Sequence, residues 1–144
     1  MFRRDMKERD MDRMVGLFVN AAERCFDAGF DAVEIHMGHG YLLNQFLSPL
    51  DNQRKDQYGG SAENRARFPA RILKAVKEAV GDRMAVIAKI NVADGRSKGA
   101  QLEDGIVTAK MLEEAGADML VLSGGRNVES GWFTFGSNMN LDAM

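Results

Sequence analysis

The chain has 144 residues, of which 45% are apolar and 28% charged, and its formal net charge is -2. This composition is too apolar for a disordered chain, and the near-neutral charge gives no long-range attraction to nucleic acid or to an anionic membrane surface. No apolar run approaches the ~20 residues that cross a bilayer. The single cysteine is typical of a reducing compartment. We therefore expect a cytoplasmic protein that binds neither nucleic acid nor membrane.

The N-terminal part of the chain predicts one helix. Charged residues alternate with methionines over residues 1–13, which indicates a charged, solvated helical lead-in. Apolar residues then recur with helical spacing from Met14 to Phe26, and Gly29 follows where a helix commonly ends. Cys25 falls on the apolar stripe, so it is interpreted as a packed core thiol rather than a nucleophile.

The rest of the chain alternates short β-branched runs with helical patterns. Strands are predicted over 31–36, 84–91 and 118–123, and helices over 61–81 and 102–115. Pro69 should kink or restart the first of these helices, because proline has no N–H to donate. The order predicts parallel strands with right-handed crossovers, as a doubly wound sheet or a segment of a (β/α)8 barrel.

Residues 38–61 form a long irregular segment between the first predicted strand and the next helix. Loops of this length in compact domains are usually functional or disordered. This one carries Tyr41, Phe46 and other apolar residues, so we expect it to pack against the rest of the domain.

In both architectures functional side chains gather at the carboxyl ends of the strands. Both histidines of the chain, His36 and His39, lie at the end of the first strand. Strand alternation places Glu34 and His36 on the face opposite Val33, and Lys89 on that same face of the second strand. Inside a closed barrel, Glu34 and Lys89 would be expected to pair, because a buried charge needs a partner.

These residues leave several alternatives open. His36 and His39 could bind a metal, although no third ligand is evident, and Lys89 could form a Schiff base as in aldolase-like barrels. The histidines could also be structural, with Lys89 on the surface. No Gly-x-Gly-x-x-Gly sequence opens a helix after a strand, so a dinucleotide fingerprint is missing.

A long string of residues resembles the old yellow enzyme family of flavin-dependent reductases. The string is Ala28-Gly29-Phe30-Asp31-x-Val33-Glu34-Ile35-His36, then His39-Gly40-Tyr41-Leu42-Leu43-x-Gln45-Phe46-Leu47-Ser48-Pro49, then Tyr58-Gly59-Gly60-Ser61-x-Glu63-Asn64-Arg65-x-Arg67-Phe68. The similarity spans about residues 12–127 and looks closest to the NADH:flavin oxidoreductase and 2,4-dienoyl-CoA reductase-like branch.

The resemblance implies an FMN-dependent (β/α)8 barrel that takes hydride from NAD(P)H and reduces an electron-poor alkene, which would be a small-molecule enone or enoyl thioester. His36 and His39 match the pair that hydrogen-bonds the substrate oxygen, Tyr41 matches the proton donor, and Lys89 falls where the family holds the flavin N1–O2 edge. Arg54, Tyr58, Arg65 and Arg67 are interpreted as scaffolding, and Ser123, Gly124 and Gly125 as part of the barrel mouth.

A (β/α)8 barrel needs roughly 250 residues, so the resemblance implies a partial barrel with three parallel strands, similar to strands 4–6 of the family. We expect a lead-in at 1–13, a central barrel segment at 14–127 and a truncated tail at 128–144. Exposed strand edges invite pairing, so a homo-oligomer is expected. The alternative is an inactive half-barrel that acts only as an oligomer or an interaction module.

Overall fold

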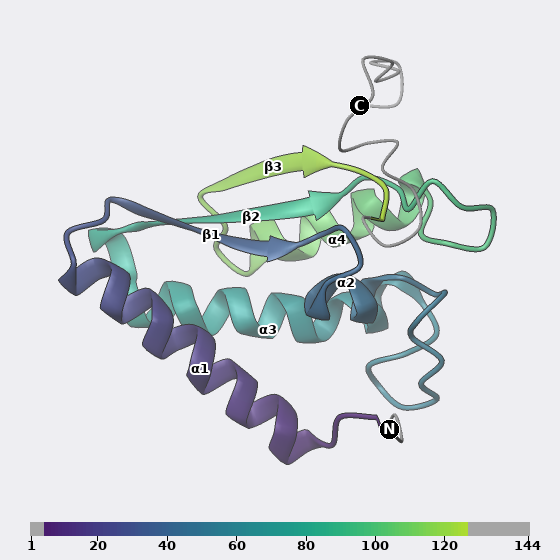
Figure 1. Ribbon diagram of the computed structural model, residues 1–144, viewed down its shortest axis with the longest axis horizontal. Helices are drawn as coiled ribbons and strands as arrows, with labels where there is room; N and C mark the ends of the chain where they lie inside the picture. The colour runs from purple at the N-terminus through teal and green to yellow at the C-terminus, as the bar shows by residue number, and fades with distance from the viewer. Residues whose placement is uncertain (1–4, 127–144) are drawn as a thin grey trace.

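A computed structural model describes residues 5–126 of the chain. The elements in chain order are α1 (Glu8–Asp27), β1 (Ala32–Met37), α2 (Leu42–Leu47), α3 (Ala62–Val80), the 3-10 turn η1 (Gly81–Arg83), β2 (Ala85–Asn91), α4 (Leu102–Glu114) and β3 (Met119–Ser123). The strands form one parallel sheet in the order β1-β2-β3, as Figure 1 shows. The three predicted strands are therefore confirmed, each within one residue of its expected start.

The long helices lie on one side of this sheet (Figure 1), and α3 contacts both α1 and α4. The side chains of Val86, Ala88 and Ile90 are at most 1% exposed and point into this helical layer. Across residues 5–126, no helix covers the other face of the sheet, and none is long and apolar enough to span a membrane. One face of the sheet thus makes the core while the other stays open.

The predicted alternation along the strands is confirmed. Ile35 and Met37 are buried against the helices, while Glu34 is exposed and His36 is half-buried on the open face. In the parallel register His36 lies opposite Lys89, and Glu34 lies opposite Ile87. The expected Glu34–Lys89 ion pair is not among the ion pairs of residues 5–126, because the register puts Lys89 beside the histidine instead.

Helix α1 begins inside the segment that was predicted as a solvated lead-in. Met11 is fully buried in the core, whereas Glu8, Arg9, Asp12 and Arg13 are exposed, so this part of the helix is solvated except at Met11. Glu8 accepts hydrogen bonds from Tyr58 Oη at 3.0 Å and from Arg71 Nη1 at 2.7 Å. The predicted tail over 128–144 lies outside the described residues.

Two local predictions differ from the structure. Helix α3 continues through Pro69 without restarting, because buried neighbours such as Phe68, Ile72 and Leu73 hold it against the core and offset the lost backbone hydrogen bond. The segment 38–61 contains the short helix α2, which sequence periodicity missed. The expectation that this segment packs is confirmed, since Leu43, Phe46 and Leu47 are buried.

The predicted scaffolding role of the arginines holds best for Arg65. Its buried guanidinium donates to the carbonyl oxygens of Leu47 (2.8 Å) and Gly60, and pairs with Asp104 at 2.6 Å. Arg54 pairs with Asp56 and donates to the Met6 carbonyl at 2.8 Å. Arg67 is exposed, and within residues 5–126 its guanidinium donates only to Asn64.

Candidate active site

The open face of the sheet is built from every second residue of each strand. Its members are Ala32, Glu34 and His36 of β1, Ala85, Ile87, Lys89 and Asn91 of β2, and Met119, Val121 and Ser123 of β3. Because the strands are parallel and in register, their carboxyl ends meet at one edge. The predicted strand-end residues therefore come together there.

His36, His39 and Tyr41 form a cluster at this edge. The ring centroids of His36 and His39 are 5.1 Å apart, and those of His36 and Tyr41 are 5.3 Å apart. Lys89 occupies the register position beside His36. The structure thus brings together all four site residues that the sequence predicted, with the Tyr41 side chain exposed and His39 only 9% exposed.

A left-handed turn carries the chain from β1 to Tyr41. His39 has φ 60° and Gly40 has φ 83°, so two consecutive residues occupy a region that side chains rarely adopt. The turn is fixed from both sides, because Gly40 N–H donates to Asn44 Oδ1 at 2.8 Å and its carbonyl accepts from Gln45 Nε2 at 2.9 Å. The strained conformation turns His39 back toward β3.

Asn91 ties the ends of all three strands together. Its Oδ1 accepts the backbone N–H of His39 at 3.1 Å, and its Nδ2 donates to the Gly125 carbonyl at 2.8 Å and to Asp94 Oδ1 at 3.3 Å. A Cβ on Gly38 would lie 2.7 Å from Asn91 Oδ1, so only glycine allows this approach. The buried amide therefore fixes the backbone on which His39 stands.

The imidazole of His39 is held separately from its backbone. Its Nε2 lies 2.7 Å from Ser123 Oγ, across the sheet edge from β1 to β3. Ser123 was expected near the barrel mouth, but neither this contact nor the role of Asn91 was predicted from the sequence. The available signal was strand alternation, which places both residues on the same face as Lys89.

The cluster favours neutral imidazoles. Burial lowers the pKa of His36, the Lys89 ammonium lowers it further, and Glu34 acts in the opposite direction. Burial also lowers the pKa of His39, with added contributions from His36 and Lys89. A neutral imidazole offers one N–H donor and one acceptor nitrogen, which suits binding of an oxygen atom.

The metal-site alternative finds no support in residues 5–126, which contain no group of three His, Cys, Asp or Glu side chains placed to hold an ion. A cavity of about 450 Å³ lies beside α2 and is lined by residues that include Met6, Phe46 and Arg54. None of the histidine cluster lines this cavity. The chemistry-bearing groups therefore lie on an open surface of the sheet.

Arg126 follows this edge of the sheet and was given no role from the sequence. It forms an isolated parallel bridge with His39, and its Nη1 pairs with Asp51 Oδ2 at 2.6 Å. A Cβ on Gly40 would approach the Arg126 guanidinium at 3.6 Å. This ion pair joins the loop after β3 to the loop after α2, so it encloses the turn that carries His39.

The chain is similar to known proteins in both sequence and fold. Residues 1–131 match the model of the NADH:flavin oxidoreductase / NADH oxidase family. The chain is 42% identical over 133 residues to the 4,4'-dithiodibutanoate disulfide reductase of Rhodococcus erythropolis, which covers 92% of this chain and 33% of that protein. It is 42% identical over 122 residues to the NADPH dehydrogenase of Geobacillus sp. (strain WCH70), covering 85% and 35%. The chain thus spans about a third of the length of these relatives.

Two solved structures share the fold. A 2-naphthoyl-CoA reductase in complex with 2-naphthoyl-CoA superposes with a TM-score of 0.82 at 34% identity, over 86% of this chain and 19% of that chain. The histamine dehydrogenase from Rhizobium sp. 4-9 superposes with a TM-score of 0.77, also at 34% identity, over 85% and 18%. The three parallel strands and their flanking helices are therefore part of a (β/α)8 barrel fold.

Proposed function

Because the chain belongs to the NADH:flavin oxidoreductase / NADH oxidase family, we propose that it is the central segment of an FMN-dependent oxidoreductase that uses NAD(P)H to reduce an activated C=C bond. The observation that carries this proposal is the gathering of His36, His39, Tyr41 and Lys89 at one edge of the open face. A cytoplasmic location stays a prediction from the composition.

Lys89 fits the flavin that the family implies. Its ammonium group forms no hydrogen bond or ion pair within residues 5–126, and it belongs to the open face of the sheet. A cation there would hold the electron-rich N1–O2 edge of FMN. A bound FMN would supply the hydride-transfer chemistry between NAD(P)H and the β-carbon of the alkene.

The histidines would bind and polarise the substrate. His36 and His39 are held close together, and each neutral ring has one N–H to donate. Two donors directed at a carbonyl oxygen stabilise the negative charge that develops on it as the β-carbon is attacked. The same pair would serve an enone or an enoyl thioester, since both present a carbonyl oxygen conjugated to the alkene.

Tyr41 would give the proton that completes the reduction. Its side chain is 54% exposed beside His36, so its hydroxyl can reach a molecule that lies over the open face. A phenol is a weak acid, so it would donate to the α-carbon only as charge builds there. The thioester named in the 2-naphthoyl-CoA reductase complex supports an enoyl thioester as one substrate class.

A chimera tests the proposal directly. Residues 5–126 would replace the matching segment of the Geobacillus NADPH dehydrogenase, which supplies the remainder of a barrel. We expect the chimera to copurify with FMN, to be reduced by NADPH under anaerobic conditions and to be reoxidised by 2-cyclohexenone. Tyr41→Phe should slow reoxidation by a factor of about 10² or more, the usual contribution of a proton donor, and leave reduction by NADPH unchanged.

The control is Phe30→Tyr, which changes an exposed ring in the turn before β1 and should alter neither half-reaction. A chimera that folds but binds no FMN would refute the proposal. Equal slowing of both half-reactions by Tyr41→Phe would refute the proton-donor role.

A further inference from the structure

The side chain of His39 has a partner that substrate binding does not require. Ser123 Oγ lies 2.7 Å from His39 Nε2 and joins the end of β3 to the turn after β1. In a neutral imidazole one ring nitrogen carries the proton and the other accepts. The direction of this hydrogen bond therefore decides which tautomer His39 adopts.

The two directions of this hydrogen bond leave different groups of His39 available to a ligand. If Nε2–H donates to Ser123, the serine hydroxyl proton and the Nδ1 lone pair both lack a partner within residues 5–126. If the Ser123 hydroxyl donates to Nε2, Nδ1–H and the lone pairs of Ser123 Oγ lack a partner within residues 5–126 instead. Only this second arrangement leaves His39 an N–H that can donate to a substrate oxygen, as the proposed function requires.

The surroundings of His39 keep the ring in this position. Asn91 Oδ1 binds the His39 backbone N–H at 3.1 Å, the residue sits at φ 60°, and only 9% of its surface is exposed. The serine backbone is fixed as well, since its carbonyl accepts the N–H of Val92 at 2.8 Å. The Ser123–His39 contact thus joins two rigid backbone segments.

We propose that Ser123 is a positioning residue that holds His39 as the Nδ1–H tautomer. The Nδ1–H group is then the single ring donor that His39 can offer to a substrate oxygen, alongside His36. The identity of that oxygen rests on the proposed function, but the tautomer can be measured without flavin or substrate.

The experiment uses the 144-residue chain labelled with ¹⁵N in histidine. The sequence has two histidines, so a long-range ¹H–¹⁵N correlation spectrum contains two imidazoles, which a His36→Gln sample assigns. At pH about 8, above the ordinary histidine pKa of about 6.5, both rings are neutral. We expect His39 to show the cross-peak pattern of the pure Nδ1–H form.

Two substitutions then separate the hydroxyl from the shape of the side chain. Ser123→Ala should move His39 to a mixture dominated by the Nε2–H form that free histidine favours, and Ser123→Thr should restore the Nδ1–H form. Ser97→Ala, on an exposed loop residue, should change nothing. If Ser123→Ala loses the folded far-UV circular dichroism, Ser123→Cys takes its place, because a thiol is a weak donor.

Either of two results overturns the proposal: a wild-type His39 in any form other than Nδ1–H, or a His39 tautomer that does not respond to loss of the hydroxyl. Failure of the proposed function looks different. In that case the chain shows the expected tautomers while the chimera binds no FMN. In a chimera that does bind FMN, Ser123→Ala should slow reoxidation by 2-cyclohexenone.

Discussion

The protonation of His36 depends on two neighbours of opposite charge. Lys89, its register partner on β2, disfavours the imidazolium, while Glu34, two residues earlier on the same face of β1, favours it. Burial acts with Lys89, so the net effect is a pKa below the ordinary value. His39 shares the influence of Lys89, and Glu34 is not among the causes of its lowered pKa.

This arrangement predicts shifts of opposite sign from two substitutions. Lys89→Met removes a nearby positive charge, so the pKa of both histidines should rise toward the ordinary value of about 6.5. Glu34→Gln removes the negative charge, so the pKa of His36 should fall further while that of His39 stays unchanged. Titration of the two imidazole resonances by NMR measures the pKa of both histidines in each variant. A fall in the His36 pKa on Lys89→Met would contradict the assignment of Lys89 as its charged neighbour.

At the scale of elements, Arg65 joins parts of the chain that are far apart in sequence. From α3 its guanidinium binds the end of α2 at the Leu47 carbonyl, the loop at the Gly60 carbonyl, and Asp104 in the first turn of α4. The residue is 6% exposed, so water cannot replace these partners easily. Arg65 therefore helps to hold α2, and with it the turn that carries His39 and Tyr41.

Arg65→Lys should lower the free energy of unfolding by about 2 kcal/mol, because one ammonium group cannot reproduce three hydrogen bonds from a planar fork. The matched control is Arg67→Lys on the same helix, where the exposed guanidinium binds only Asn64, and a change within about 0.5 kcal/mol is expected. Urea unfolding followed by circular dichroism measures both values. Equal losses of unfolding free energy in the two variants would show that the buried Arg65 contributes no more to stability than the exposed Arg67.

The sequence predicted the strands and the long helices because these depend on local periodicity. The meeting of parallel strand ends also places His36, His39, Tyr41 and Lys89 at one edge, but their roles were implied by the family resemblance and stay predictions. The sequence missed α2, because six residues give less than two turns of pattern and Tyr41 makes no side-chain hydrogen bond as its N-cap. It also missed the hydrogen bond between Ser123 and His39 and the hydrogen bond from the His39 backbone N–H to Asn91. Those bonds join residues 84 and 52 positions apart, and only the register of the assembled sheet brings them together.

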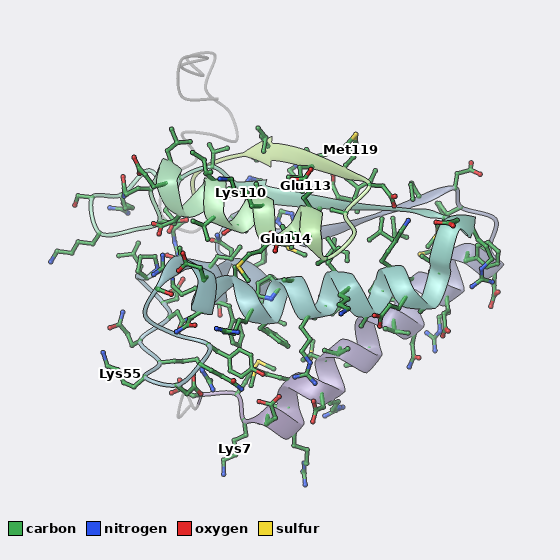
Figure 2. All side chains as sticks on the ribbon, turned by 180° about the vertical axis from the view of Figure 1, so that it is seen from behind. Lys7, Lys55, Lys110, Glu113, Glu114 and Met119 are labelled. Carbon is green, nitrogen blue, oxygen red and sulfur yellow. The ribbon has the colours of Figure 1, made fainter. Side chains whose placement is uncertain are left out.

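In the described part of the molecule, helices cover only one face of the sheet. Apolar side chains on the open face and on the outer edge of β3 are unusually exposed. For Met119 the exposed fraction is 51%. Figure 2 shows Met119 projecting from β3 away from the helices. Exposed strand edges favour pairing with further strands. We therefore predict that the isolated chain self-associates.

The uncovered face of the sheet predicts how the isolated 144-residue chain responds to FMN. The described residues supply three strands of a fold that closes with eight, so a flavin on the open face would be covered by protein on one side only. Lys89 alone would then meet the cofactor in water, where a single exposed charge contributes roughly 1 kcal/mol or less. We expect FMN fluorescence to show no saturable change at micromolar concentrations of the chain, with wild type and Lys89→Met indistinguishable, whereas the chimera binds FMN tightly. Tight, stoichiometric quenching by the wild-type chain that Lys89→Met abolishes would mean that three strands already form the flavin site.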